Sequence, residues 1–362
     1  MGDKGGAINE LRKFTQDPLQ NSAVAPTAVL QLAILLREQN KADEAANVLQ
    51  AARQKHEPNL QKEPERIALL RYHYGVCLQE GGKFGDAKNV LDSVLQVAPN
   101  SPISAEAVLR SGQARISEAK KSVETARQNL TKGDLKDDQR RQLNEQIQNA
   151  YNAMSETAQN FEQRADNWRQ AMPTSESRAR MYYDAAWTWR AVAEYETAQA
   201  RLRLAQEKQR QLQEEANKKT PPNQKPPTVP LPEIPLASVP PQPGEGKARV
   251  SYQKLVENFP DLYLSVEGRF ELAEMLGERG EHAQAVKVLR EALDKEPTDK
   301  APTPELMDRV RLRLGASLAA NKETEAALGE CDVIANSPLS QFVAQDQLRA
   351  GEILLEHGDP AK

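Results

Sequence analysis

One recurring spacing constrains how this chain can fold: a small residue, an alanine twelve positions later, and a proline about twelve positions after that. A period of about 34 residues with two helical segments per period is typical of a solenoid, in which each helix–turn–helix unit packs on its neighbours. The small residue lets two helices approach closely, and the proline ends the second helix. The spacing occurs in Gly75, Ala87 and Pro99 and in Ala273, Ala285 and Pro297, and with the proline displaced by one place in Ala33, Ala45 and Pro58 and in Gly315, Ala327 and Pro338.

These four units resemble the tetratricopeptide repeat (TPR) family. With the small residue at repeat position 8, positions 7, 11, 24 and 27 should be apolar, and all four units satisfy this rule. The aromatic residue of position 4 is replaced by Val29, Arg71, Arg269 and Arg311, so the repeats are degenerate. The resemblance implies an all-α, TPR-like α-solenoid of antiparallel helix pairs that binds other proteins. The apolar residues are Leu32, Leu36, Leu49 and Ala52; Tyr74, Leu78, Leu91 and Val94; Leu272, Leu276, Leu289 and Ala292; and Leu314, Leu318, Cys331 and Ile334.

Composition agrees with this fold and limits the classes of partner that we expect. Charged residues make up 28% of the chain, aromatic residues 5%, and the mean hydropathy is −0.71, as in helices that bury a narrow apolar stripe. The net charge of −4 predicts no nucleic-acid binding, because it provides no basic footprint. No apolar stretch is long enough for a transmembrane helix. The composition does not indicate whether the chain forms a homo-oligomer.

In the middle of the chain the repeat pattern stretches. Residues 1–112 carry the N-terminal TPR-like repeats and 246–362 the C-terminal ones. Residues 113–175 predict an extended helical hairpin with a coiled-coil-like seam, projecting about 20–30 Å beyond the solenoid. The alternative interpretation is a lengthened repeat with no separate role. The outgoing seam is Ile116, Ala119, Val123, Ala126 and Leu130, and the returning one is Leu143, Ile147, Ala150, Met154, Ala158, Phe161, Ala165 and Trp168, ending at Pro173.

An interrupted repeat follows. Residues 176–217 predict one long helix, with Ala186 at the small-residue position. Residues 218–245 form a proline-rich insertion that is disordered or extended, since ten of the 23 prolines lie between 221 and 243. Ala248, Tyr252 and Leu255 then fit the second helix of the same repeat. The insertion is either a flexible connector or a ligand for a proline-recognising groove, because 227–230 and 232–235 have PxxP spacing.

Motifs for catalysis, metals or cofactors are missing from the sequence. The four histidines are scattered, and HExxH, CxxC, Gly-rich phosphate loops and GxSxG do not occur. Cys77 and Cys331 lie far apart in the repeat order and are expected to be inert small hydrophobes. We therefore expect no cofactor, no metal and no enzymatic activity. Gly2–Asp3 and Gly358–Asp359 occupy the same repeat position, which suggests a fragment of a longer protein.

The resemblance also implies a concave groove lined by the first helix of each repeat. Large side chains recur there, and Tyr183, Trp187 and Arg190 form the most site-like cluster, because Trp, Tyr and Arg dominate binding hot spots. An equally good interpretation of the leucines is half-burial against the next repeat. The groove residues expected to bind a partner peptide or helix are Leu30, Tyr72, Tyr183, Trp187, Arg190, Phe270 and Leu312.

Two rival functions remain open. Asn258-Phe-Pro260 and Ala98-Pro-Asn-Ser-Pro102, each followed by a new repeat, are similar to turns in bacterial envelope TPR proteins of the TolA-binding and outer-membrane assembly types. That resemblance implies a periplasmic scaffold at the cell envelope. The other rival is a regulatory or structural arm of a larger enzyme or complex.

Overall fold

The all-α prediction is confirmed. The computed structural model describes residues 3–167, 174–221, 223–336 and 341–357, and within these ranges it contains fourteen α-helices and no strand. The chain divides into two compact units, Met1–Asp184 and Ala185–Lys362. Some residues used in the repeat pattern fall outside the described ranges, namely Gly2, Trp168, Pro173, Pro338, Gly358 and Asp359.

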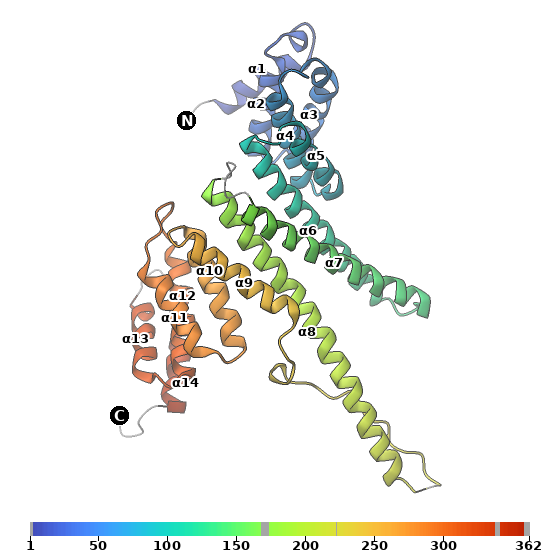
Figure 1. The fold of residues 1–362 in the computed structure, drawn as a ribbon, viewed down its shortest axis with the longest axis vertical. Coiled ribbons are helices and arrows are strands. Elements are labelled where there is room, and N and C mark those ends of the chain that lie inside the picture. The colour runs from blue at the N-terminus through green and yellow to red at the C-terminus, as the bar shows by residue number, and fades with distance from the viewer. Residues whose placement is uncertain (1–2, 168–173, 222, 337–340, 358–362) are drawn as a thin grey trace. The chain divides into compact units, whose positions relative to one another are not determined.

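The first unit is a run of antiparallel helices, each packed on the next (Figure 1). A long hairpin closes it, in which α6 packs along α7. The predicted seam of this hairpin is buried at Ile116, Ala126, Met154 and Phe161, as the three-and-four spacing requires. The helices are α1 (Lys4–Arg12), α2 (Ala25–Glu38), α3 (Ala42–His56), α4 (Pro64–Glu80), α5 (Phe84–Val97), α6 (Pro102–Leu130), α7 (Asp137–Asn167) and the start of α8 (Ser175–Lys219), with 3-10 turns at Lys13–Thr15, Leu19–Asn21 and Glu57–Asn59.

The second unit begins within α8 and restores the interrupted repeat. After the proline-rich segment, Ala248, Tyr252 and Leu255 are fully buried on α9, as expected for the second helix of the repeat. Successive helices then pack on one another up to α14. The elements after α8 are a 3-10 turn (Leu236–Ser238), α9 (Pro243–Asn258), α10 (Tyr263–Glu278), α11 (His282–Asp294), α12 (Pro304–Ala320), α13 (Thr324–Ala335) and α14 (Val343–His357).

The predicted apolar positions form the core of the repeats. Fifteen of the sixteen residues are at most 5% exposed. The exception is Tyr74, which is half-buried and lies under the Arg53 guanidinium, 4.9 Å from its ring centre. The periodic apolar stripe therefore identifies the buried face of each helix pair.

The turn inside each of the four regular repeats is the same. The second residue after the first helix adopts a left-handed conformation, with φ of 59° at Asn40, 73° at Gly82, 76° at Gly280 and 67° at Lys322. In each turn the next residue's N–H bonds to the carbonyl of the position-11 leucine, five residues earlier, at 2.9–3.0 Å. This is a Schellman cap, which satisfies carbonyls left free at the helix end.

The space available to a side chain at the small-residue position differs between repeats. A Cβ on Gly75 would lie 2.5 Å from Leu91 Cγ, and one on Gly112 would lie 2.3 Å from Phe161 Cζ, so both positions need glycine for close helix packing. At Gly315 the nearest atom would be 3.5 Å away. An alanine would therefore fit at this position, as it does at Ala33 and Ala273 in the equivalent position of two other repeats.

No helix in the described ranges combines the length and the apolar character that crossing a membrane requires.

Candidate functional site

In the first unit, polar side chains join the first helices of successive repeats. The Arg37 guanidinium on α2 donates to the Glu80 carboxylate on α4, with Nε 2.8 Å from Oε2, and this bond raises the pKa of Arg37. On the next pair, the Tyr72 hydroxyl donates to Glu106 at 3.4 Å. Burial raises the pKa of Tyr72, so the hydroxyl stays protonated at neutral pH.

The same arrangement continues at the end of this unit. Gln113 on α6 donates to Asp184 Oδ2 on α8 at 2.7 Å, and Arg180 Nε lies 3.1 Å from Asp184 Oδ1. Burial raises the pKa of Asp184, while Arg180 and Gln113 act in the opposite direction. These contacts satisfy a carboxyl group that burial would otherwise penalise.

In the second unit, α10 carries a row of glutamates on one face. Glu267, Glu271, Glu274 and Glu278 are spaced four, three and four residues apart. From α8, Arg190 bonds to Glu271 and lies 3.1 Å from Glu278 Oε1. Burial raises the pKa of Glu271, and Arg190 acts against that rise.

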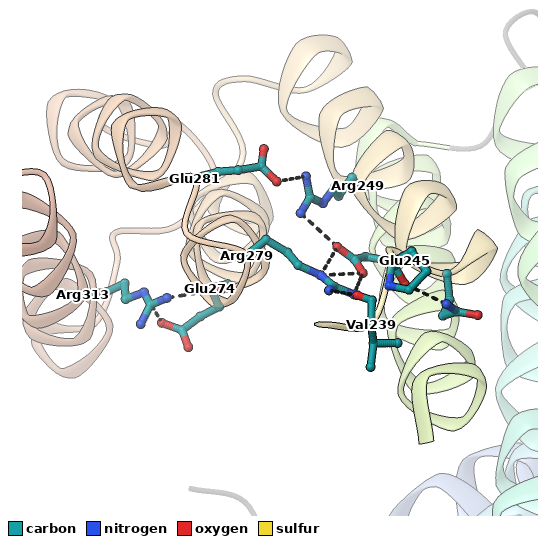
Figure 2. A network of polar contacts seen from close by, with 9 residues as sticks. Val239, Glu245, Arg249, Glu274, Arg279, Glu281 and Arg313 are labelled. Atoms are coloured by element: carbon teal, nitrogen blue, oxygen red, sulfur yellow. Dashed lines mark hydrogen bonds and ion pairs between the residues drawn. The ribbon is translucent and has the colours of Figure 1, made fainter. Parts of the chain in front are cut away.

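From the other side, α12 supplies the matching cation. Arg313 Nε lies 2.9 Å from Glu274 Oε1 (Figure 2). A Cβ on Gly277 would lie 1.9 Å from Arg313 Nη2, so the glycine makes space for the guanidinium. The three first helices of this unit are therefore joined by alternating arginine and glutamate side chains.

A more deeply buried network fixes the start of α9. Glu245 is 7% exposed and accepts from Arg279 Nη2 at 2.6 Å and from Arg249 Nη2 at 3.0 Å. Arg279 also donates to the Val239 carbonyl at 2.8 Å, and Arg249 donates to Glu281 at 2.7 Å (Figure 2). The network ties the end of the proline-rich segment and α9 to α10.

The packing of α9 on α8 depends on a glycine. A Cβ on Gly244 would lie 2.9 Å from the backbone nitrogen of Ala193. The Gly244 N–H donates to Glu196 at 2.8 Å, and the Lys247 ammonium lies 4.1 Å from the ring centre of Trp189. The second helix of the interrupted repeat is thus held by specific contacts despite the insertion.

A pocket of about 200 Å³ lies beside this network. Small-molecule sites usually have volumes of about 300–1,000 Å³, so this pocket suits a single side chain better than a free ligand. Its lining is amphipathic, with alanine and methionine side chains between charged ones. It is lined by Arg190, Ala193, Glu194, Thr197, Ala198, Arg201, Leu236, Glu245, Met275, Glu278 and Arg279.

The predicted groove residues fall in both units and differ in exposure. Leu30, Tyr72 and Tyr183 belong to the first unit and are half-buried. In the second unit, Trp187 is 45% exposed, while Arg190 and Leu312 are half-buried.

Phe270 is only 7% exposed, and the Arg309 guanidinium covers its ring at 4.6 Å. Trp187 and Arg190 lie three residues apart on α8, so the structure keeps these two together. Phe270 is thus the buried member of the residues that were expected to line the groove.

At repeat position 4, where the family pattern has an aromatic residue, three repeats have an arginine. Two of these arginines bond to a glutamate: Arg71 Nη2 donates to Glu57 at 2.9 Å, and Arg311 Nη1 donates to Glu330 at 2.9 Å. Arg269 is 1% exposed, and its Nε lies 3.9 Å from Glu291. The sequence signal that could have predicted these ion pairs is an arginine at position 4 of the first helix together with a glutamate in the second helix of the same repeat or in the segment before its first helix.

The buried cysteines and His73 are uncharged at neutral pH, as expected for side chains that pack in a core. Among the described residues, no cluster of three or more His, Cys, Asp or Glu side chains could hold a metal ion. Burial raises the pKa of the Cys77 and Cys331 thiols to about 12, so neither is a thiolate at neutral pH. Burial lowers the pKa of His73 to about 4.

Comparisons with known proteins agree with the repeat pattern. Residues 30–102 match the tetratricopeptide repeat family model. No match was found among curated protein sequences.

Similar solved structures include three with TM-scores between 0.26 and 0.39. A tetratricopeptide repeat protein from Parabacteroides merdae is 12% identical, with 97% of this chain and 98% of that chain covered and a TM-score of 0.39. The assembly chaperone of RpL4, Acl4, is 16% identical, with 92% and 96% covered and a TM-score of 0.38. The TPR2AB domain of yeast Sti1 in a pHSP90 complex is 13% identical, with 92% and 99% covered and a TM-score of 0.26.

Proposed function

We propose that this chain, of which residues 30–102 match the tetratricopeptide repeat family model, is a non-catalytic scaffold that binds a protein partner. The repeats present extended faces of helices, and such faces bind peptides or helices. Within the second unit, we place the partner at the first helices α8, α10 and α12.

One observation supports this location above others. Trp187 is 45% exposed on α8, although tryptophan is among the side chains most often buried on average. Arg190 lies one helical turn further on, and its partners Glu271 and Glu278 present half-buried and exposed carboxylates. An exposed tryptophan beside an arginine is the composition typical of an interface hot spot.

The pocket beside Arg190 supplies the second contact. Ala193, Thr197 and Met275 give it apolar and small walls, and Glu194 and Glu278 give it a charged rim. We propose that a large side chain of the partner enters this pocket while the partner's backbone crosses Trp187. The partner is accordingly a helix or an extended peptide with an apolar anchor and a charged neighbour.

The test compares two exposed apolar residues of the same helix. Trp187→Ala should weaken capture of the partner from a native-cell extract by about 30-fold, which corresponds to about 2 kcal/mol for a hot spot. Leu202→Ala is the matched control, because Leu202 is 42% exposed on the same helix but lies about four helical turns beyond Trp187, away from the proposed path of the partner. Equal capture of the same protein by both variants would refute the proposed site.

A further inference from the structure

The proline-rich segment lies against the distal part of α8. We call residues 223–239 the strap. Three α8 side chains bond to the strap's backbone: Gln213 Nε2 donates to the Pro227 carbonyl at 2.9 Å, and Gln209 Nε2 to the Val229 carbonyl at 2.8 Å. Arg201 Nε donates to the Ile234 carbonyl at 2.9 Å. The strap runs antiparallel to α8, and Figure 1 shows it returning beside that helix to α9.

The spacing of these contacts matches an extended chain. From Gln213 back to Arg201 the helix rises about 18 Å at about 1.5 Å per residue. On the strap, the bonded carbonyls from Pro227 to Ile234 span about 22 Å at about 3.1 Å per residue, the rise of polyproline II. Pro235 has φ −61° and ψ 146°, which are polyproline II values. The strap is therefore almost fully extended along α8. A flexible connector would not need its length between contacts to match the length of the helix beside it.

Burial along the strap follows the same geometry. Pro226, Val229 and Pro232 are half-buried, while Pro227 and Pro230 are exposed. A period of three is the turn length of polyproline II, so one edge of the strap faces α8. Further along, Ile234 and Val239 form a small apolar cluster with Ala205 of α8, and all three are at most 8% exposed.

One contact depends on the kind of residue in the strap. The Val229 N–H donates to Gln213 Oε1 at 2.9 Å, while the Gln213 amide nitrogen donates to the Pro227 carbonyl. The same glutamine side chain therefore hydrogen-bonds to one backbone acceptor and one backbone donor of the strap. Proline has no N–H, so position 229 must be a residue other than proline, although prolines surround it.

We propose that the face of α8 from Arg201 to Gln213 is a binding site for an extended proline-rich peptide, occupied in this chain by its own strap. The glutamines supply donors to carbonyls that a polyproline II segment leaves without internal partners. Gln213 selects a non-proline residue at one position, and Ala205 accepts a branched apolar side chain five residues later. This site shares Arg201 and the strap's Leu236 with the pocket beside Arg190. None of its hydrogen bonds involves Trp187.

The binding test uses the full chain with residues 223–235 replaced by a Gly/Ser segment of equal length. A fluorescent peptide of residues 223–238 should bind this chain saturably, measured by anisotropy. A Gln213→Ala change in the same chain should weaken that binding by about tenfold without changing its melting temperature, since it removes two hydrogen bonds at the surface.

The peptide provides a matched pair of variants. Val229→Pro removes the N–H that Gln213 accepts and should weaken binding by at least about tenfold. Thr228→Pro adds a proline at the neighbouring exposed position and should bind like the unchanged peptide. No saturable binding at millimolar peptide, or equal binding of the two variants, would overturn the proposal.

The intact chain gives an independent readout. The Val229 amide should exchange its hydrogen more slowly than in the free peptide, and Gln213→Ala should abolish the difference. Exchange at the free-peptide rate in the unaltered chain would contradict the proposal. Trp187→Ala should leave peptide binding unchanged, so failure of this site and failure of the groove are distinguishable.

Discussion

Replacing Arg279 with methionine tests whether the buried network holds the interrupted repeat together. Methionine keeps an apolar stem in place but removes the charge that neutralises Glu245. The side chains of Arg279 and Glu245 are 12% and 9% exposed, so the remaining carboxylate cannot recover full hydration. Removing one partner of a buried ion pair costs about 3–5 kcal/mol. Because Arg249 still bonds to Glu245 at 3.0 Å, we expect the lower end, about 3 kcal/mol.

Thermal unfolding measures this loss. For a unit of about this size each kcal/mol shifts the melting temperature by about 2–4 °C, so the variant should melt about 6–12 °C lower. Hydrogen–deuterium exchange of peptides from α9 and α10 should locate the loss in the second unit. The double variant with Glu245→Gln should recover part of it, because the carboxylate that had lost its partner is then absent.

The control is Arg313→Met. Arg313 and Glu274 are 23% and 28% exposed, and such pairs contribute at most about 1 kcal/mol. If Arg279→Met melts within 1–2 °C of Arg313→Met (about 0.5 kcal/mol), the buried network does not stabilise the unit and the reasoning fails.

Two further predictions concern single positions in the repeats. Lys322 is the one left-handed turn residue of the four that is neither glycine nor asparagine, so Lys322→Gly should stabilise the second unit by about 0.5–1 kcal/mol, whereas Gly280→Ala should destabilise it. Urea midpoints measure both changes, and a lower midpoint for Lys322→Gly would contradict the turn's strain. His73 has a folded-state pKa of about 4, below its ordinary value of 6.5, so the unfolded chain binds the proton first. Stability from neutral His73 is therefore present above about pH 6.5 and is lost as the pH falls towards 4, and this part of the pH dependence should be absent in His73→Leu.

The local repeat pattern was sufficient to predict the helices and their buried faces. The apolar positions and the second helix at Ala248, Tyr252 and Leu255 follow from a short-range period, and the same period places the turn before each second helix. The hairpin seam could be predicted for the same reason. These features depend on residues only three to twelve positions apart.

The polar contacts could not be predicted in this way, because they join residues far apart in the chain. Glu245 meets Arg279 only because α9 packs on α10, and Gln213 meets Val229 only because the strap turns back along α8. Sequence patterns gave no reason to pair these side chains. The exposure of Trp187 and the burial of Phe270 likewise depend on tertiary packing around residues of the same predicted groove.

Hydrogen–deuterium exchange of the full chain with its captured partner tests the central claim most directly, since it reports every helix at once. If the chain is a scaffold that binds through the first helices of the second unit, the partner should slow exchange in α8 around Trp187 and Arg190 and in α10 from Glu271 to Glu278. Protection confined to other helices, with these segments unchanged, would contradict the account.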